Sequence, residues 1–207
     1  MLKLKKTNTA EYALYLSKKD SSLWKKILLV QLPYYLNIKF MSLSKTLDIG
    51  CGTGRNLARL SNSVGVDHNY FCVEACRNKG LIAYNPSEFH SNGSNYKSSF
   101  DTLLLSHVIE HMTYSDSISL INEYLPYLKN KSRIVIITPQ IRGYKSDSTH
   151  VTYFDSLLIK KLLLDVGASP EGSRSFPLPI YFGRVFRNNE LISVGNIQSE
   201  MSTDDEP

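Results

Sequence analysis

The chain has 207 residues, of which 42% are hydrophobic and 21% charged, as is usual for a globular protein of one domain. Its net charge is +5, and its three cysteines are too few and too close together for a disulfide framework, which favours a reducing cytoplasm. No apolar run is long enough for a membrane span, and the lysine-rich first residues lack the pattern of a signal peptide. These totals argue against a disulfide-rich secreted domain and against an integral membrane protein.

Residues 1–44 are expected to form a helical extension. Residues 10–17 and 22–40 have apolar side chains at helical spacing, and Pro33 should kink or end the second helix. The region is rich in lysine. A basic face could meet an anionic substrate, a membrane surface or nucleic acid, although a solvated helix surface explains the lysines equally well.

The most informative stretch is residues 45–56. A short buried strand is predicted at residues 46–49, with Asp48 near its end, and a helical pattern begins at Arg55. Between strand and helix, glycines fall at alternate positions: Gly50, Gly52 and Gly54. A strand, a glycine turn and a helix start allow backbone N–H groups to approach a ligand closely.

The spacing of this turn is G-x-G-x-G, whereas dinucleotide-binding enzymes have G-x-G-x-x-G. An acidic residue before the glycines suits the positively charged end of an amino acid better than a pyrophosphate. The stretch Leu-Asp-Ile-Gly-Cys-Gly-Thr-Gly, residues 47–54, resembles the first motif of the class I S-adenosylmethionine (SAM)-dependent methyltransferases. The alternative is a glycine turn in another α/β fold.

The resemblance implies an α/β fold with a doubly wound, mostly parallel, seven-stranded Rossmann-like sheet. It also implies N-terminal helices that cover the cofactor cleft, unless those helices serve only in packing. Asp48 and the turn, including Cys51, would then hold the methionine end of SAM. Three segments are expected: a helical extension at 1–44, a SAM-binding domain at 45–197 and a disordered acidic tail at 198–207.

A second buried strand is expected at residues 64–68 and brings Asp67 to its end. An acidic residue there can accept hydrogen bonds from both ribose hydroxyls, and His68 would flank the adenosine. The alternative is that Asp67 caps the helix predicted at residues 70–78. Cys72 and Cys76 on that helix are interpreted as packing residues.

The later elements alternate between strands and helices. Strands are predicted at residues 81–84, 100–107 and 132–139, helices at 115–128 (capped by Ser115 or Asp116) and 155–166 (ended by Gly167), turns and loops at 85–89 and 91–99, and a closing β-ribbon at 173–196. This alternation indicates βαβ units and a parallel sheet. Because ligands bind beyond the carboxyl ends of such strands, Asp67, His107 and Thr138 should converge on one cleft.

A second group of chemically active residues follows the strand at residues 100–107. Ser106 and His107 end it, Glu110 and His111 follow, and His150 comes from the loop after the next strand. The group resembles the Glu-x-x-Glu-His pattern of ubiquinone-pathway O-methyltransferases and the metal site of small-RNA 2′-O-methyltransferases. That resemblance implies a divalent metal held by His107, Glu110, His111 and His150.

Because a histidine replaces the first carboxylate of that pattern, zinc, iron or manganese would suit the group better than magnesium. Two other interpretations stay open. His111 or His150 could act as a general base without metal. Alternatively, the group is structural, with His107 packed against the cofactor.

Residues 138–151 and 175–179 are similar to a group of small bacterial methyltransferases. The expected function is methyl transfer from SAM to a hydroxyl of a small molecule or of a glycan or lipid precursor, by a cytoplasmic monomer or homodimer. The alternatives are a metal-dependent RNA 2′-O-methyltransferase, which would bind nucleic acid, and a non-catalytic SAM-binding protein. A more distant alternative is an NAD-dependent dehydrogenase.

Overall fold

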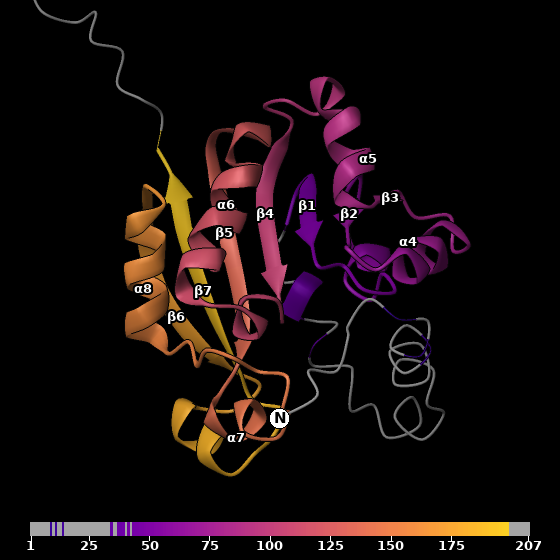
Figure 1. Cartoon of the computed structure of the whole chain (residues 1–207). Coiled ribbons are helices and arrows are strands. Elements are labelled where there is room, and N and C mark those ends of the chain that lie inside the picture. Colours follow the sequence, from indigo (N-terminus) through magenta and orange to yellow (C-terminus); the bar gives the residue numbers. More distant parts are fainter. Residues whose placement is uncertain are drawn as a thin grey trace, which may run out of the picture.

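The computed structural model describes residues 43–198 together with Thr9, Glu11, Leu14, Tyr34, residues 37–39 and Met41. One seven-stranded sheet runs through these residues in the order β3-β2-β1-β4-β5-β7-β6 (Figure 1). Its strands are β1 (Thr46–Ile49), β2 (Val64–Val66), β3 (Ala83–Tyr84), β4 (Phe100–Ser106), β5 (Leu128–Pro139), β6 (Ala168–Phe176) and β7 (Glu190–Ile197). The pairs among β1 to β5 are parallel, whereas β7 lies antiparallel between β5 and β6. This is the predicted doubly wound, Rossmann-like methyltransferase sheet.

Short helices connect the strands. The α-helices of the described residues are α4 (Tyr70–Arg77), α5 (Pro86–Ser91), α6 (Tyr114–Tyr124), α7 (Ile141–Tyr144) and α8 (Ser156–Asp165). The 3₁₀ helices are η1 (Leu57–Arg59), η2 (Gly93–Asn95), η3 (Ile109–His111), η4 (Leu125–Tyr127) and η5 (Ile180–Arg184). None of these helices is both long and apolar enough to cross a membrane.

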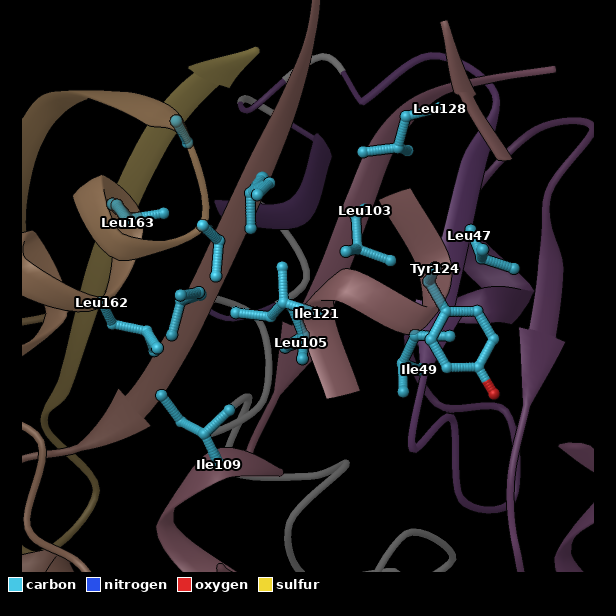
Figure 2. Packing of buried hydrophobic residues seen from close by; sticks show 14 of the residues in the cluster. Leu47, Ile49, Leu103, Leu105, Ile109, Ile121, Tyr124, Leu128, Leu162 and Leu163 are labelled. Carbon is cyan, nitrogen blue, oxygen red and sulfur yellow. The ribbon is translucent and has the colours of Figure 1, made fainter. Parts of the chain in front are cut away.

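The core lies on both faces of the central strands. Because side chains alternate along a strand, Leu103 and Leu105 of β4 share one face, where Ile121 of α6 and Leu162 of α8 pack against them (Figure 2). Burying each such side chain stabilises the fold by roughly 1.5–3 kcal/mol. Helices α6 and α8 therefore cover this face of the sheet.

The opposite face is covered by the residues that precede β1. Leu104 of β4 and Val135 of β5 point to this face, where Ile38 and Leu43 join them in a second buried cluster. Ile38 is only 5% exposed. Ile38 and Leu43 of the N-terminal region thus pack on the sheet against β4 and β5.

Three local predictions were wrong. The helix predicted after the glycine turn is only η1, because Leu60 is already extended and the polar residues that follow offer no apolar repeat to bury. Residues 86–91 form helix α5 where a turn was predicted at 85–89, since Asn85 and Glu88 make a capping box. Helix α6 is capped by Thr113, with Asp116 as its capping-box partner, instead of by Ser115 or Asp116, and it ends at Tyr124, directly before η4, instead of at Leu128.

The helix stop signal at Gly167 is confirmed, with φ of +77° immediately after α8. The predicted closing β-ribbon is the β6–β7 pair. The helices predicted at residues 10–17 and 22–40 and the tail at 198–207 lie largely outside the described residues. The domain boundary after residue 44 stays a prediction.

Candidate functional site

The carboxyl ends of β1, β2, β4 and β5 meet at one edge of the sheet, and a pocket opens there. Its lining comes from the glycine turn, β4, β5, β7 and the N-terminal region: Tyr34, Asn37, Ile38, Arg55, Asn56, Ser106, Ile137 and Glu190. Asp67, His107 and Thr138 were predicted to converge on one cleft, and none of the three is among the residues that line this pocket, where Ile137 represents β5.

The glycine turn is fixed to the tip of β2. The N–H groups of Gly50 and Cys51 donate to the carbonyl oxygen of Val66 at 2.8 and 3.2 Å. Gly50 has φ of +67°, and a Cβ there would lie 2.5 Å from Val108, so a side chain would be both strained and crowded. The glycine at position 50 therefore lets the turn pack directly against Val108.

Asp67 ties the turn to β2 while keeping acceptor capacity. Its Oδ2 accepts the N–H of Gly52 and its Oδ1 accepts the N–H of Asn69, both at 2.8 Å. A carboxylate has about four acceptor positions, so two hydroxyl donors can still be accommodated. The cap of α4 is Asn69, whose side chain accepts the N–H of Phe71 at 2.9 Å, and the interpretation of Asp67 as that helix cap is wrong.

His68 lies beside this carboxylate, with Nδ1 3.7 Å from Asp67 Oδ1 and 57% of its side chain exposed. The predicted packing role of Cys72 and Cys76 agrees with their burial, and Cys51, which was predicted to hold the cofactor, is buried as well; all three cysteines are free. Cys76 donates its thiol to the carbonyl oxygen of Gly52 at 3.2 Å. The glycine turn is thus held by β2 on one side and by α4 on the other.

Asp48 is a buried carboxylate without a partner. It is 1% exposed, and among the described residues neither of its oxygens has a hydrogen-bond partner. Burial raises the pKa of Asp48 to about 7, opposed by the Arg55 guanidinium and reinforced by the charge of Asp67. An unpaired buried carboxylate is unfavourable, and a cationic donor bound in the turn would relieve it.

His107 is held between two carboxylates. Its Nδ1 lies 3.1 Å from Glu110 Oε1 and its Nε2 lies 2.9 Å from Glu190 Oε1. Burial alone would lower the pKa of His107, but the hydrogen bonds to Glu110 and Glu190 outweigh it and raise that pKa to about 9. His107 is therefore an imidazolium at neutral pH, with both ring nitrogens engaged.

The backbone of His107 is also unusual. Its φ is +59°, a left-handed conformation that is uncommon for a residue with a side chain. Its N–H donates to the carbonyl oxygen of Ile137 at 2.8 Å, and the two carboxylates hold its ring. Such conformations persist only where the surroundings enforce them, and they cluster at functional sites.

The structure brings Glu110, His111 and His150 together, with one possible ligand atom from each lying within 4.8 Å of the others. The nitrogen Nδ1 of His150 donates to the carbonyl oxygen of Tyr144 at 2.8 Å, and Nδ1 of His111 donates to that of Thr149 at 3.3 Å. These bonds leave the Nε2 atoms as the proton-accepting or metal-binding nitrogens. His107 is not part of this group.

The surroundings of His111 favour its neutral form. Burial lowers the pKa of His111, the charge of Glu110 opposes this shift, and the nearby His150 lowers that pKa further. Glu110 is 1% exposed, and within the described residues its Oε2 has no hydrogen-bond partner. The group therefore combines a neutral base with an unpaired carboxylate oxygen.

Sequence reasoning missed Glu190, Arg55 and Asn56 as residues of the site. Glu190 reaches His107 only because antiparallel β7 lies next to β5, and no local sequence pattern predicts this strand pairing. The only signal was an acidic residue immediately before an apolar strand. Arg55 and Asn56 directly follow the glycine motif and could have been included on that ground.

Replacing Glu190 with Gln should lower the pKa of His107. The pKa of His107 should fall from about 9 toward its ordinary value, because the charge that holds the proton is removed. A raised histidine pKa stabilises the fold fully below about pH 6.5, and the contribution is lost as pH rises through 9. Since the ring is a third exposed, screening leaves a loss of about 1 kcal/mol at pH 7.

Imidazole titration by NMR and urea unfolding measure these changes. The matched control is Glu123→Gln, which removes the carboxylate partner of the more exposed His90 and should leave His107 unaffected. An unchanged His107 titration in Glu190→Gln would show that the second carboxylate does not hold the proton.

Comparison with known proteins identifies the family. The family model described as a methyltransferase domain matches residues 17–169. No curated protein matches the sequence. Many solved structures share the fold with this chain at low sequence identity, and three of them are methyltransferases with the following similarity.

A SAM-dependent methyltransferase from Archaeoglobus fulgidus is 19% identical over 88% of this chain and 99% of its own, with a TM-score of 0.65. Magnesium protoporphyrin IX methyltransferase from Synechocystis PCC 6803, with bound S-adenosylhomocysteine (SAH), is 13% identical over 93% and 96%, with a TM-score of 0.62. A SAM-dependent methyltransferase from Methanosarcina mazei is 16% identical over 75% and 93%, with a TM-score of 0.57. The chain belongs to the methyltransferase domain family and is a methyl-transferring enzyme with the class I fold.

Proposed function

We propose that this methyltransferase transfers a methyl group from SAM to a hydroxyl of a small molecule or of a glycan or lipid precursor. The observation that carries the proposal is the pair formed by His150 and by His111, whose pKa is lowered by burial: their ring centroids lie 4.8 Å apart beside the buried carboxylate of Glu110. Such a pair can accept a proton from a hydroxyl at neutral pH. The resemblance to ubiquinone-pathway O-methyltransferases points the same way.

The cofactor side uses the residues around the glycine turn. Asp48 would pair with the ammonium group of SAM, and Asp67 would accept hydrogen bonds from the ribose hydroxyls, with His68 beside them. The backbone of residues 50–54 would line the methionine end, and Ser106 and His107 would close the cleft from β4. When bound, SAM supplies an electrophilic methyl group on a sulfonium.

On the acceptor side the chain would remove the proton of the acceptor hydroxyl. Nε2 of His111 or His150 would take the proton from the acceptor hydroxyl, and the Glu110 carboxylate would stabilise the imidazolium that forms. Regeneration requires only that this proton passes to solvent. The protein's other contribution is alignment of the acceptor with the methyl group and exclusion of water.

A second candidate is metal-dependent transfer, as in the RNA 2′-O-methyltransferases that the sequence also resembles. One carboxylate and two imidazoles within 4.8 Å of one another support it, and this donor set suits zinc, iron or manganese. The Nδ1 bonds to backbone carbonyls are the kind that orient metal-binding histidines. Glu110, His111 and His150 would hold the ion, which would lower the pKa of an acceptor hydroxyl.

We also infer a reducing, cytoplasmic location. Cys51, Cys72 and Cys76 are all free in the structure, which supports the inference.

Calorimetric titration with SAH tests the cofactor assignment. Wild type should bind, and Asp67→Ala should bind at least tenfold more weakly, because hydrogen bonds to a charged group contribute roughly 1.5–3 kcal/mol each. The matched control is Asp101→Ala, which removes an exposed carboxylate paired with Lys129 at the amino end of β4 and should bind as wild type does.

Thermal unfolding of each variant checks the fold, since Asp67 also anchors Gly52. Full SAH affinity in a folded Asp67→Ala would refute the ribose assignment. No binding by wild type would refute the cofactor site as a whole.

Metal titration separates the two candidates for the acceptor side. If a metal is used, metal-free wild type should bind one Mn²⁺ or Zn²⁺, and His150→Ala should abolish binding. His90→Ala should bind normally, since His90 pairs with Glu123 on a different part of the molecule. Absence of binding by wild type would exclude the metal-dependent candidate and leave the histidine pair as a metal-free base.

A further inference from the structure

Large apolar side chains gather on the connection between β6 and β7. Five of them are exposed within eight positions, namely Leu178 (36%), Ile180 (59%), Tyr181 (67%), Phe182 (39%) and Val185 (72%). Elsewhere in the described residues, exposed large apolar side chains occur singly or in pairs on separate elements. A local concentration of this kind marks an interaction surface.

This connection is held firmly against helix α7, and we call the two together the α7–η5 lobe (residues 140–145 and 177–189). A Cβ at Gly143 would lie 2.6 Å from the carbonyl oxygen of Arg187, and a Cβ at Gly183 would overlap the side chain of Gln140. Both glycines therefore permit direct backbone packing between the two parts. The exposed apolar side chains are presented by a defined backbone.

The inner polar groups of the lobe are satisfied. Asn189 is fully buried, accepts the N–H of Leu178 at 2.9 Å and donates to the Leu178 carbonyl oxygen at 3.1 Å. Gln140 donates to Ser175 Oγ at 2.6 Å and to the carbonyl oxygen of Glu190 at 3.0 Å. The fold thus fixes the inside of the lobe while its outside stays apolar.

The outside of the lobe is also cationic. Arg142, Lys145, Arg184 and Arg187 are exposed, and within the described residues no acidic side chain forms an ion pair with them. Residues 172–189 contain no acidic residue, and the nearest exposed one along the chain from α7 is Asp147. Apolar and aromatic side chains flanked by unpaired cations are complementary to a surface that is apolar inside and anionic outside.

We propose that the α7–η5 lobe docks onto membranes that contain anionic lipids. Ile180, Tyr181 and Val185 enter the interface, while Arg184 and Arg187 contact the headgroups. A second copy of the chain fits less well, because a twofold contact through this surface would bring like charges together.

Docking rests on the proposed function and narrows it to an amphiphilic acceptor. The lobe begins directly after β5 (Figure 1). The carbonyl oxygen of its Tyr144 accepts the Nδ1 proton of His150 at 2.8 Å, and the lobe ends directly before Glu190, whose carboxylate bonds to His107. A membrane-bound lobe therefore brings the acceptor side of the site to the lipid surface. The hydroxyl to be methylated would belong to a molecule anchored in that surface.

Vesicle co-sedimentation of the full chain tests the apolar contribution. Wild type should bind vesicles of phosphatidylcholine mixed equally with phosphatidylglycerol and bind phosphatidylcholine alone far more weakly. The double variant Ile180→Gln with Val185→Gln should lose roughly tenfold or more in binding. The matched control is Leu157→Gln with Leu164→Gln, side chains of similar exposure on α8, which should bind as wild type does.

A second pair of variants tests the charge. Arg184→Gln with Arg187→Gln should lose roughly tenfold in binding to the mixed vesicles, and added salt should weaken wild-type binding in the same way. Lys97→Gln with Lys160→Gln changes the net charge equally at exposed positions on other elements and should have little effect.

Absence of wild-type binding to the mixed vesicles would overturn the proposal and point to a protein partner for the lobe. Equal losses in the lobe variants and their controls would overturn it as well. SAH titration on the same samples separates this result from a failure of the proposed function. Intact SAH binding without vesicle binding refutes docking alone, whereas loss of SAH binding by wild type refutes the cofactor site.

Discussion

The site depends on a carboxylate that the fold buries without giving it a partner. Asp48 lies in β1, between β2 and β4, where both neighbouring strands exclude water from it. The glycine turn that follows is hydrogen-bonded to Val66 and Asp67 without any ligand. A cationic group that enters this turn would meet the carboxylate of Asp48. Binding is therefore favoured, because it would pair a buried charge that otherwise has no partner.

A second constraint is the fixed position of His107. His107 joins three elements, since it ends β4, contacts Glu110 of η3 and contacts Glu190 of β7. A carboxylate on each side balances the positive charge of its protonated ring, which cannot act as a base. The pKa of His111 is instead lowered by burial, so the pKa values of two histidines four positions apart are shifted in opposite directions.

Local motifs made part of this arrangement predictable. The glycine turn, β2 and the position of Asp67 follow from short-range pattern, because each depends on neighbours within a few residues. Glu190 could not be found in this way, since it meets His107 through the antiparallel pairing of β5 and β7. The exposed lobe was also beyond prediction, because the sequence of a proline-containing connection does not tell which side chains face outward.

Calorimetric measurement of proton release on SAH binding tests the central role of Asp48 most directly. Titrations at pH 7 in two buffers with different heats of ionisation give the number of protons exchanged. Because the pKa of Asp48 is about 7 in the free protein and a bound ammonium would lower it, wild type should release roughly half a proton. The release should vanish in Asp48→Asn. Binding without proton release, or equal release in Asp48→Asn, would contradict the account.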